Sequence, residues 1–174
     1  MSGMKAHFRR LAAYNCWAND RLYDAVGKLP PAEFAAPRIG FFPSLAKTLN
    51  HILVGDSLWL GRLDGQGSPG INRLDQQLHS EFAALRQARA SLDTRYIAFI
   101  DGLSEARIGE NLVYKTVAGE AMETAIDQVL THVFNHQTHH RGQAHAMLSS
   151  TPVPPPSLDL IYFLRDHPEI ARLR

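Results

Sequence analysis

Residues 132–143 read His-Val-Phe-Asn-His-Gln-Thr-His-His-Arg-Gly-Gln and place four of the chain's nine histidines within a short stretch. Imidazole is the commonest protein ligand for a transition metal. Two histidines four positions apart on a helix lie on one face, one turn above the other. The stretch therefore predicts a helix that offers two nitrogens to one ion, with a third ligand arriving from elsewhere in the chain.

The apolar residues around this stretch indicate which histidines face the core. On a wheel that advances about 100° per residue they share one direction, and they are Ile126, Val129, Leu130, Val133, Phe134 and Ala144. His140 falls about 40° and His136 about 80° from that direction. His132 and His139 fall about 120° and about 140° away. We therefore expect His136 and His140 at the edge of the core, and the other two facing solvent or a flank.

Apolar residues at helical spacing fill most of the remaining chain. They predict four long helices, with expected bounds at residues 4–28, 43–63, 78–102 and 122–149. Pro30-Pro31 and Gly102 are expected stops, and Pro43 fits the first turn of the second helix. Long amphipathic helices with mostly short connections predict an all-α fold, an up-down four-helix bundle. Bundles of this kind often hold metals between facing helices.

Three shorter segments complete this prediction. Residues 112–117 are rich in β-branched and aromatic side chains and close on Gly119, which predicts a short β-hairpin before the fourth helix. Residues 151–156, Thr-Pro-Val-Pro-Pro-Pro, predict an extended connector. Ser157 can then cap a short C-terminal helix that ends near Asp166. Since neither a repeat nor a low-complexity linker is visible, we expect residues 1–174 to form a single domain.

Composition excludes several classes of protein. Eighteen basic residues stand against seventeen acidic ones, so charge gives no reason to expect nucleic acid or an anionic membrane as a partner. No apolar run approaches the roughly 20 residues that span a bilayer, and the N-terminus lacks an apolar signal core. One cysteine, Cys16, excludes an intrachain disulfide. These features predict a cytoplasmic protein.

Helical periodicity alone does not identify the third metal ligand. A catalytic zinc-like site uses three protein ligands and one vacant position. His51 is a candidate, but it lies about 120° from the apolar stripe of its helix, whereas Asp56 lies near the centre of that stripe. The wheel therefore allows Asp56 as a carboxylate ligand and does not select His51.

Four segments resemble the DinB family of bacterial four-helix-bundle proteins. They are Tyr-Asn-Cys-Trp-Ala-Asn-Asp-Arg-Leu at 14–22, Asn-His-Ile-Leu-Val-Gly-Asp-Ser-Leu-Trp at 50–59, the histidine-rich stretch at 132–143, and Leu-Asp-Leu-Ile-Tyr-Phe-Leu at 158–164. The resemblance implies His51, His136 and His140 as the ligands of one divalent metal ion, zinc or nickel first, with iron or manganese as alternatives. It also implies a homodimer.

The activity that the resemblance implies is less specific. Related proteins include metal-dependent S-transferases that use low-molecular-weight thiols, a thiol-dependent isomerase, and members with no known reaction. A thiol at the vacant position would become a thiolate nucleophile, and water there would become a hydroxide for hydrolysis. The leading hypothesis is therefore a thiol-dependent S-transferase or a hydrolase with a small-molecule substrate. The alternative is a non-catalytic stress-response or binding protein with a structural metal or none.

Other polar residues are candidates for supporting roles. Asp56 could orient a ligand imidazole or form buried hydrogen bonds, and His139 could act as an acid–base group beside a ligand. Arg141 could bind an anionic group of a substrate, with an ordinary salt bridge as the preferred alternative. Tyr14 could line the mouth of the cavity.

Two further side chains are expected to be structural. Trp59 is expected to fill the core rather than to form a platform for a substrate. Cys16 is expected to be a small buried side chain and not a nucleophile.

Overall fold

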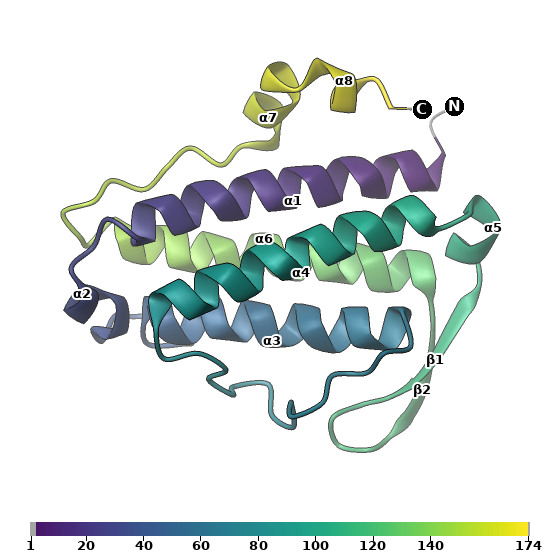
Figure 1. Ribbon diagram of the computed structural model, residues 1–174, viewed down its shortest axis with the longest axis horizontal. Coiled ribbons are helices and arrows are strands. Elements are labelled where there is room, and N and C mark those ends of the chain that lie inside the picture. Colours follow the sequence, from purple (N-terminus) through teal and green to yellow (C-terminus); the bar gives the residue numbers. More distant parts are fainter. Residues whose placement is uncertain (1–2, 174) are drawn as a thin grey trace.

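The computed structural model describes residues 3–173, and most of them are helical (Figure 1). In chain order the elements are α1 (Met4–Val26), α2 (Pro31–Ala35), α3 (Leu45–Leu63), α4 (Phe82–Gly102), α5 (Glu105–Ile108), β1 (Asn111–Lys115), β2 (Ala121–Ala125), α6 (Ile126–Leu148), α7 (Leu160–Asp166) and α8 (Pro168–Ala171). The predicted all-α class, the hairpin before the fourth long helix and the short C-terminal helix are confirmed.

The four long helices, α1, α3, α4 and α6, lie side by side (Figure 1), and the apolar core lies between them. Helix α1 packs against α4 and α6, and α3 packs against the same two helices. Each long helix therefore has two long neighbours, which is consistent with the predicted bundle. Helices α7 and α8 contact the outer side of α1. Within residues 3–173, no helix combines the length and apolarity that crossing a bilayer requires.

Two apolar clusters fill the interior. The members of the first include Leu22, Leu49, Leu85 and Leu148, and those of the second include Phe8, Ile100, Ile126 and Leu130. Trp59 and Phe99 pack against both clusters. Full burial of one such side chain stabilises the fold by about 1.5–3 kcal/mol relative to its exposure.

The first two helix boundaries differ from the predicted ones. Helix α1 ends at Val26 with Gly27 as its C-cap, before the prolines. Pro31 instead begins the unpredicted helix α2, because its fixed φ and missing N–H suit a first helical position. Pro43 lies outside α3, whose N-cap is Ser44. The Ser44 hydroxyl accepts a hydrogen bond from the backbone N–H of Lys47, so this cap sets the start of the helix.

The start of α6 was predicted too early. Residues 121–125 belong to β2 and pair antiparallel with β1, so the helix begins at Ile126. Gly119 has a φ of +89° in the connecting turn, a conformation that glycine adopts without steric cost. Cross-strand pairing of Met122 with Tyr114 extends the hairpin through the segment that periodicity assigned to the helix.

Two boundaries near the other helix ends also need correction. Helix α4 begins at Phe82, so Leu78 precedes it, although it still packs against the first cluster. The C-terminal helix begins at Leu160 with Asp159 as its N-cap, and Ser157 does not cap it.

Candidate metal centre

Three histidines from two neighbouring helices converge on one point. His51 comes from α3, and His136 and His140 come from successive turns of α6. The Nε2 atom of His51 lies 3.1 Å from that of His136 and 3.2 Å from that of His140. One nitrogen from each residue lies within 4.8 Å of the others, so the three could hold a metal ion.

The opposite ring nitrogens of two of these histidines have acceptors. His51 Nδ1 lies 2.8 Å from the backbone carbonyl oxygen of Leu74, and His140 Nδ1 lies 2.8 Å from Oε1 of Gln143. Because both partners can only accept, each Nδ1 carries the proton and donates it. The Nε2 atoms of both rings are then unprotonated, and their lone pairs face each other across 3.2 Å. A cation between them removes this repulsion, and such outer hydrogen bonds are a regular feature of metal-binding histidines.

The spacing and protonation of the rings also suit a metal ion. Two nitrogens bound about 2.0–2.1 Å from a tetrahedral ion lie about 3.3 Å apart, close to the separations seen here. Burial lowers the pKa of His136 to about 3, with a further contribution from His140 and His51. Burial also lowers the pKa values of His51 and His140. All three rings are therefore neutral at pH 7, the form that binds a metal.

The helices and a loop leave one side of the histidines covered and another accessible. The ring of Phe42 stacks on His51 at 4.1 Å and meets the edge of His140 at 5.7 Å. Gly55 lies on α3 opposite His136, and a Cβ atom at this position would be 2.9 Å from Cε1 of that ring. The glycine therefore lets α3 and α6 approach closely enough for the three nitrogens to meet.

A cavity of about 630 Å³ opens beside the histidines. Its walls come from α3, the β1–β2 hairpin, the loop between α3 and α4, and α6. His51 and His136 form part of this lining, together with Leu58, Trp59, Arg62, Leu74, Tyr114, Val117 and His132, among others. Its size is that of a small-molecule site, so a ligand in the cavity could reach the point where the three nitrogens converge.

A family model described as the DinB family matches residues 4–170. The chain belongs to the DinB family. Its match to Protein DinB of Bacillus subtilis (strain 168) has 28% identity over 144 residues and covers 80% of this chain and 83% of that protein.

Two solved structures of DinB-like proteins share the fold. The protein from Bacillus cereus ATCC 10987 gives a TM-score of 0.62 at 15% identity, over 81% of this chain and 90% of that one. A protein from Bacillus subtilis gives a TM-score of 0.59 at 12% identity, over 83% and 95%. At these identities the likeness supports the family's fold and not a shared reaction.

Two further histidines of α6, His132 and His139, lie where the wheel predicted. His132 and His139 are both exposed. His139 is nevertheless linked to the cluster, because the Gln143 amide lies 3.1 Å from His139 Nε2 while its oxygen accepts from His140. His132 lines the cavity and packs against Trp59, at 5.4 Å between ring centres.

Asp56 lies on the other side of α3, away from the three imidazoles. It is fully buried and accepts hydrogen bonds from Arg89 Nη1, at 2.6 Å, and from the Gln137 amide. Asp56 was predicted as a metal ligand, as a group that orients an imidazole, or as a buried hydrogen-bonding group. Its contacts with Arg89 and Gln137 fit the third role. Burial raises the pKa of Asp56 to about 7, although Arg89 opposes that shift.

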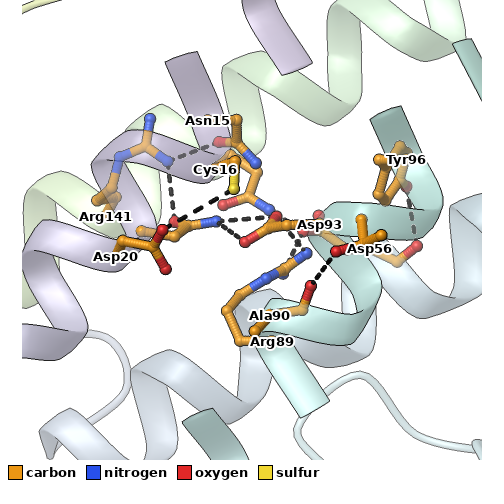
Figure 2. Close-up of polar contacts among 12 residues, drawn as sticks. Asn15, Cys16, Asp20, Asp56, Arg89, Ala90, Asp93, Tyr96 and Arg141 are labelled. Atoms are coloured by element: carbon orange, nitrogen blue, oxygen red, sulfur yellow. Dashed lines mark hydrogen bonds and ion pairs between the residues drawn. The ribbon is translucent and has the colours of Figure 1, made fainter. Parts of the chain in front are cut away.

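Arg141 is also buried and donates to Asn15 and Asn19 of α1, at 2.6 and 3.1 Å (Figure 2). It forms neither the predicted salt bridge nor part of the histidine cavity. Asn19 continues the contacts by donating to Asp93, which pairs with Arg89 at 2.8 Å. This buried polar network, which comprises Asn15, Asn19, Asp56, Arg89, Asp93, Gln137 and Arg141, joins all four long helices.

Tyr14 and Cys16 on α1 lie apart from the histidine cavity. The Tyr14 hydroxyl donates to the backbone oxygen of Leu158, and its ring packs against Phe163 of α7. Tyr14 therefore holds the C-terminal segment and lines other depressions of the surface. Cys16 is half-buried, and burial, with Asp93 next, raises the pKa of its thiol to about 11.

Sequence reasoning missed the residues that shape the centre. Gln143 could have been found, because its position three residues after His140 is a hydrogen-bonding neighbour on a helix. Leu74 contributes only a backbone carbonyl, and no side-chain pattern signals that. Gly55 and Phe42 act through the approach of separate elements, which a single sequence does not show.

Proposed function

We propose that the protein is a metal-dependent enzyme in which His51, His136 and His140 bind one divalent ion beside a small-molecule pocket. The observation that carries this proposal is the convergence of the three Nε2 atoms at the edge of a cavity. A structural metal site is normally closed by four protein ligands, whereas a catalytic one keeps a vacant position. Three histidines with a cavity beside them suit the second arrangement.

The bound ion would supply Lewis-acid chemistry, lowering the pKa of a thiol or a water at its vacant position. The chain's own residues would fix the geometry of that position. The Leu74 carbonyl and the Gln143 amide hold the Nδ1 protons, which keeps two rings in the ligating tautomer. Phe42 covers one side of the rings, so a substrate would approach through the cavity.

Two reaction classes share this site, a thiol-dependent S-transfer and a hydrolysis. In both, the ion would be zinc or nickel first, with iron or manganese as alternatives, because imidazole nitrogen suits all of them. We further propose that the protein works as a homodimer in the cytoplasm on a small molecule. Family membership supports the homodimer, the composition of the chain supports the cytoplasmic location, and the cavity supports the small-molecule substrate.

Absorption spectroscopy of the cobalt(II)-loaded protein tests the vacant position. Addition of 2-mercaptoethanol should produce a sulfur-to-cobalt charge-transfer band if a thiol can enter. The same titration with His136→Ala protein, which lacks one proposed ligand, controls for cobalt bound elsewhere.

The outcomes separate the hypotheses. A thiol-dependent band favours the S-transferase, and a spectrum that responds to pH but not to the thiol favours the hydrolase. A spectrum that responds to neither would contradict the enzyme proposal and favour a structural metal in a non-catalytic protein.

A further inference from the structure

The cavity beside the histidines contains a positive charge that has no acidic partner in the described part of the chain. Arg62 on α3 lines the cavity and is half-buried. Its Cζ atom lies 4.7 Å from the centre of the Trp59 ring and 5.0 Å from that of Tyr114. Among residues 3–173 no carboxylate forms an ion pair with it.

The ring contacts hold Arg62 in place without using its hydrogen-bonding capacity. A guanidinium on an aromatic face is attracted by the π-electrons, while its N–H donors lie in its own plane and along its edge. Within residues 3–173, no oxygen or nitrogen atom accepts a hydrogen bond from those donors. A planar anion such as a carboxylate is the group that such a fork binds best, through two parallel hydrogen bonds.

Most of the remaining cavity surface is apolar. Leu58, Trp59, Leu74, Tyr114 and Val117 all contribute to it. Val117 is 41% exposed and comes from the turn of the hairpin, so part of this apolar surface faces the opening. An apolar body of a ligand would bury these side chains and gain the usual free energy of removing apolar area from water.

Other ionisable groups in the cavity do not neutralise Arg62. Glu120 lies in the same lining, on the short segment before β2, and is exposed without an ion pair to Arg62. The cavity thus has one half-buried cation against aromatic rings and one exposed carboxylate. Because Arg62 is more buried than Glu120, its charge is less hydrated. The cavity near Arg62 therefore favours an anionic ligand.

We propose that this cavity binds small molecules that combine an apolar chain or ring with a carboxylate, and that Arg62 binds the carboxylate. The inference rests on the proposed function, since it names the class of substrate for the same site. The substrate's apolar part would lie on Trp59 and Leu58, and its reactive atom would face the histidines. The sequence suggested Arg141 for binding an anionic group, but Arg141 is buried between the helices, outside this cavity.

Fluorescence titration with a matched pair of ligands tests the proposal. The chain has two tryptophans, so Trp17→Phe protein leaves Trp59 in the cavity as the sole tryptophan reporter. The probes are 4-phenylbutyrate and its neutral amide, 4-phenylbutanamide. Metal-free protein is used, so that a carboxylate cannot bind to an ion.

The carboxylate should bind roughly tenfold more tightly than the amide, the size expected for a charge-assisted pair in a half-buried site. Arg62→Gln should abolish that preference and leave the affinity for the amide unchanged, while Arg62→Lys should restore part of it. Arg95→Gln is the matched control, because Arg95 is an exposed arginine that pairs with Asp64 outside the cavity.

Three results would overturn the proposal. They are equal binding of both probes to the Trp17→Phe protein, a carboxylate preference that survives Arg62→Gln, and no quenching of Trp59 by either probe. Failure of the proposed function is distinguishable, because a protein that binds no metal could still show the Arg62-dependent preference. If the protein binds metal but shows no carboxylate preference, the result contradicts only the carboxylate proposal and not the proposed function.

Discussion

At the scale of single residues, Gly55 has the most direct influence on the histidine geometry. A methyl group at this position would lie 2.9 Å from the His136 ring, closer than carbon atoms pack. The His136 ring would have to move, and its Nε2 would leave the point shared with His51 and His140.

Gly55→Ala should therefore weaken metal binding by roughly 10- to 100-fold, the range seen when the surroundings of a metal ligand are disturbed. The affinity is measured by competition with a chelator, and circular dichroism checks that the helices persist. Gly142→Ala is the matched control, because a Cβ atom there meets nothing within 4 Å. Equal affinities of the two variants would contradict the role given to Gly55.

Cys16 gives a second prediction at this scale. Its pKa is raised to about 11, mainly by burial, so the thiolate is scarce at neutral pH and increases as the pH rises toward that value. Iodoacetamide should alkylate the folded protein at pH 7.5 at least about tenfold more slowly than the unfolded chain. Mass spectrometry measures both alkylation rates. Equal rates would show that Cys16 is an accessible nucleophile.

At the scale of elements, α3 and α6 each carry proposed metal ligands on one face and buried polar side chains on a second face. Gln137 follows His136 and Arg141 follows His140, and both belong to the buried polar network. In Figure 2, contacts run from Arg141 across α1 to Asp93 and Arg89 and on to Asp56 of α3. Because buried polar groups cost free energy unless they are paired, this network favours one register of the helices.

The pH dependence of stability tests the state of Asp56. Its pKa is about 7 in the folded protein and 3.8 in the reference state, so the folded state binds the proton more tightly. That contribution to the free energy of unfolding is fully present below about pH 4 and is lost as the pH rises through 7.

The stability of the wild type relative to Asp56→Asn should therefore fall between about pH 4 and 7, by an amount on the order of a few kcal/mol. Urea unfolding in a chelator measures it, and Asp101→Asn controls for the loss of an exposed carboxylate. A constant or rising difference would mean that Asp56 stays ionised beside Arg89 throughout this range.

At the scale of the whole molecule, the periodicity of apolar residues predicted the helices well. It predicted the contacts between separate helices and strands less well. The wheel separated His136 and His140 from His132 and His139, because burial on one helix follows its own periodicity. It did not select His51, which lies off the apolar stripe, and only the packing of α3 on α6 explains that residue. The start of α6 was missed because pairing with β1 overrides the propensity of residues 122–125.

Metal binding should also stabilise the whole fold, because the proposed ligands meet only in the folded chain. An ion at 100 times its Kd adds about 2.7 kcal/mol to the free energy of unfolding. For a chain of this length that raises Tm by roughly 5–10 °C. Calorimetry should show the increase in wild-type protein and not in His51→Ala, and an equal increase in both would place the ion elsewhere.

The central claim is that three histidines from α3 and α6 hold one divalent ion. Equilibrium dialysis followed by elemental analysis measures it directly, on the wild type, on His51→Ala, His136→Ala and His140→Ala, and on the controls His132→Ala and His139→Ala. We predict about one ion per chain in the wild type and both controls, and a loss of most of it in each of the other three. Undiminished metal in those three variants would contradict the account.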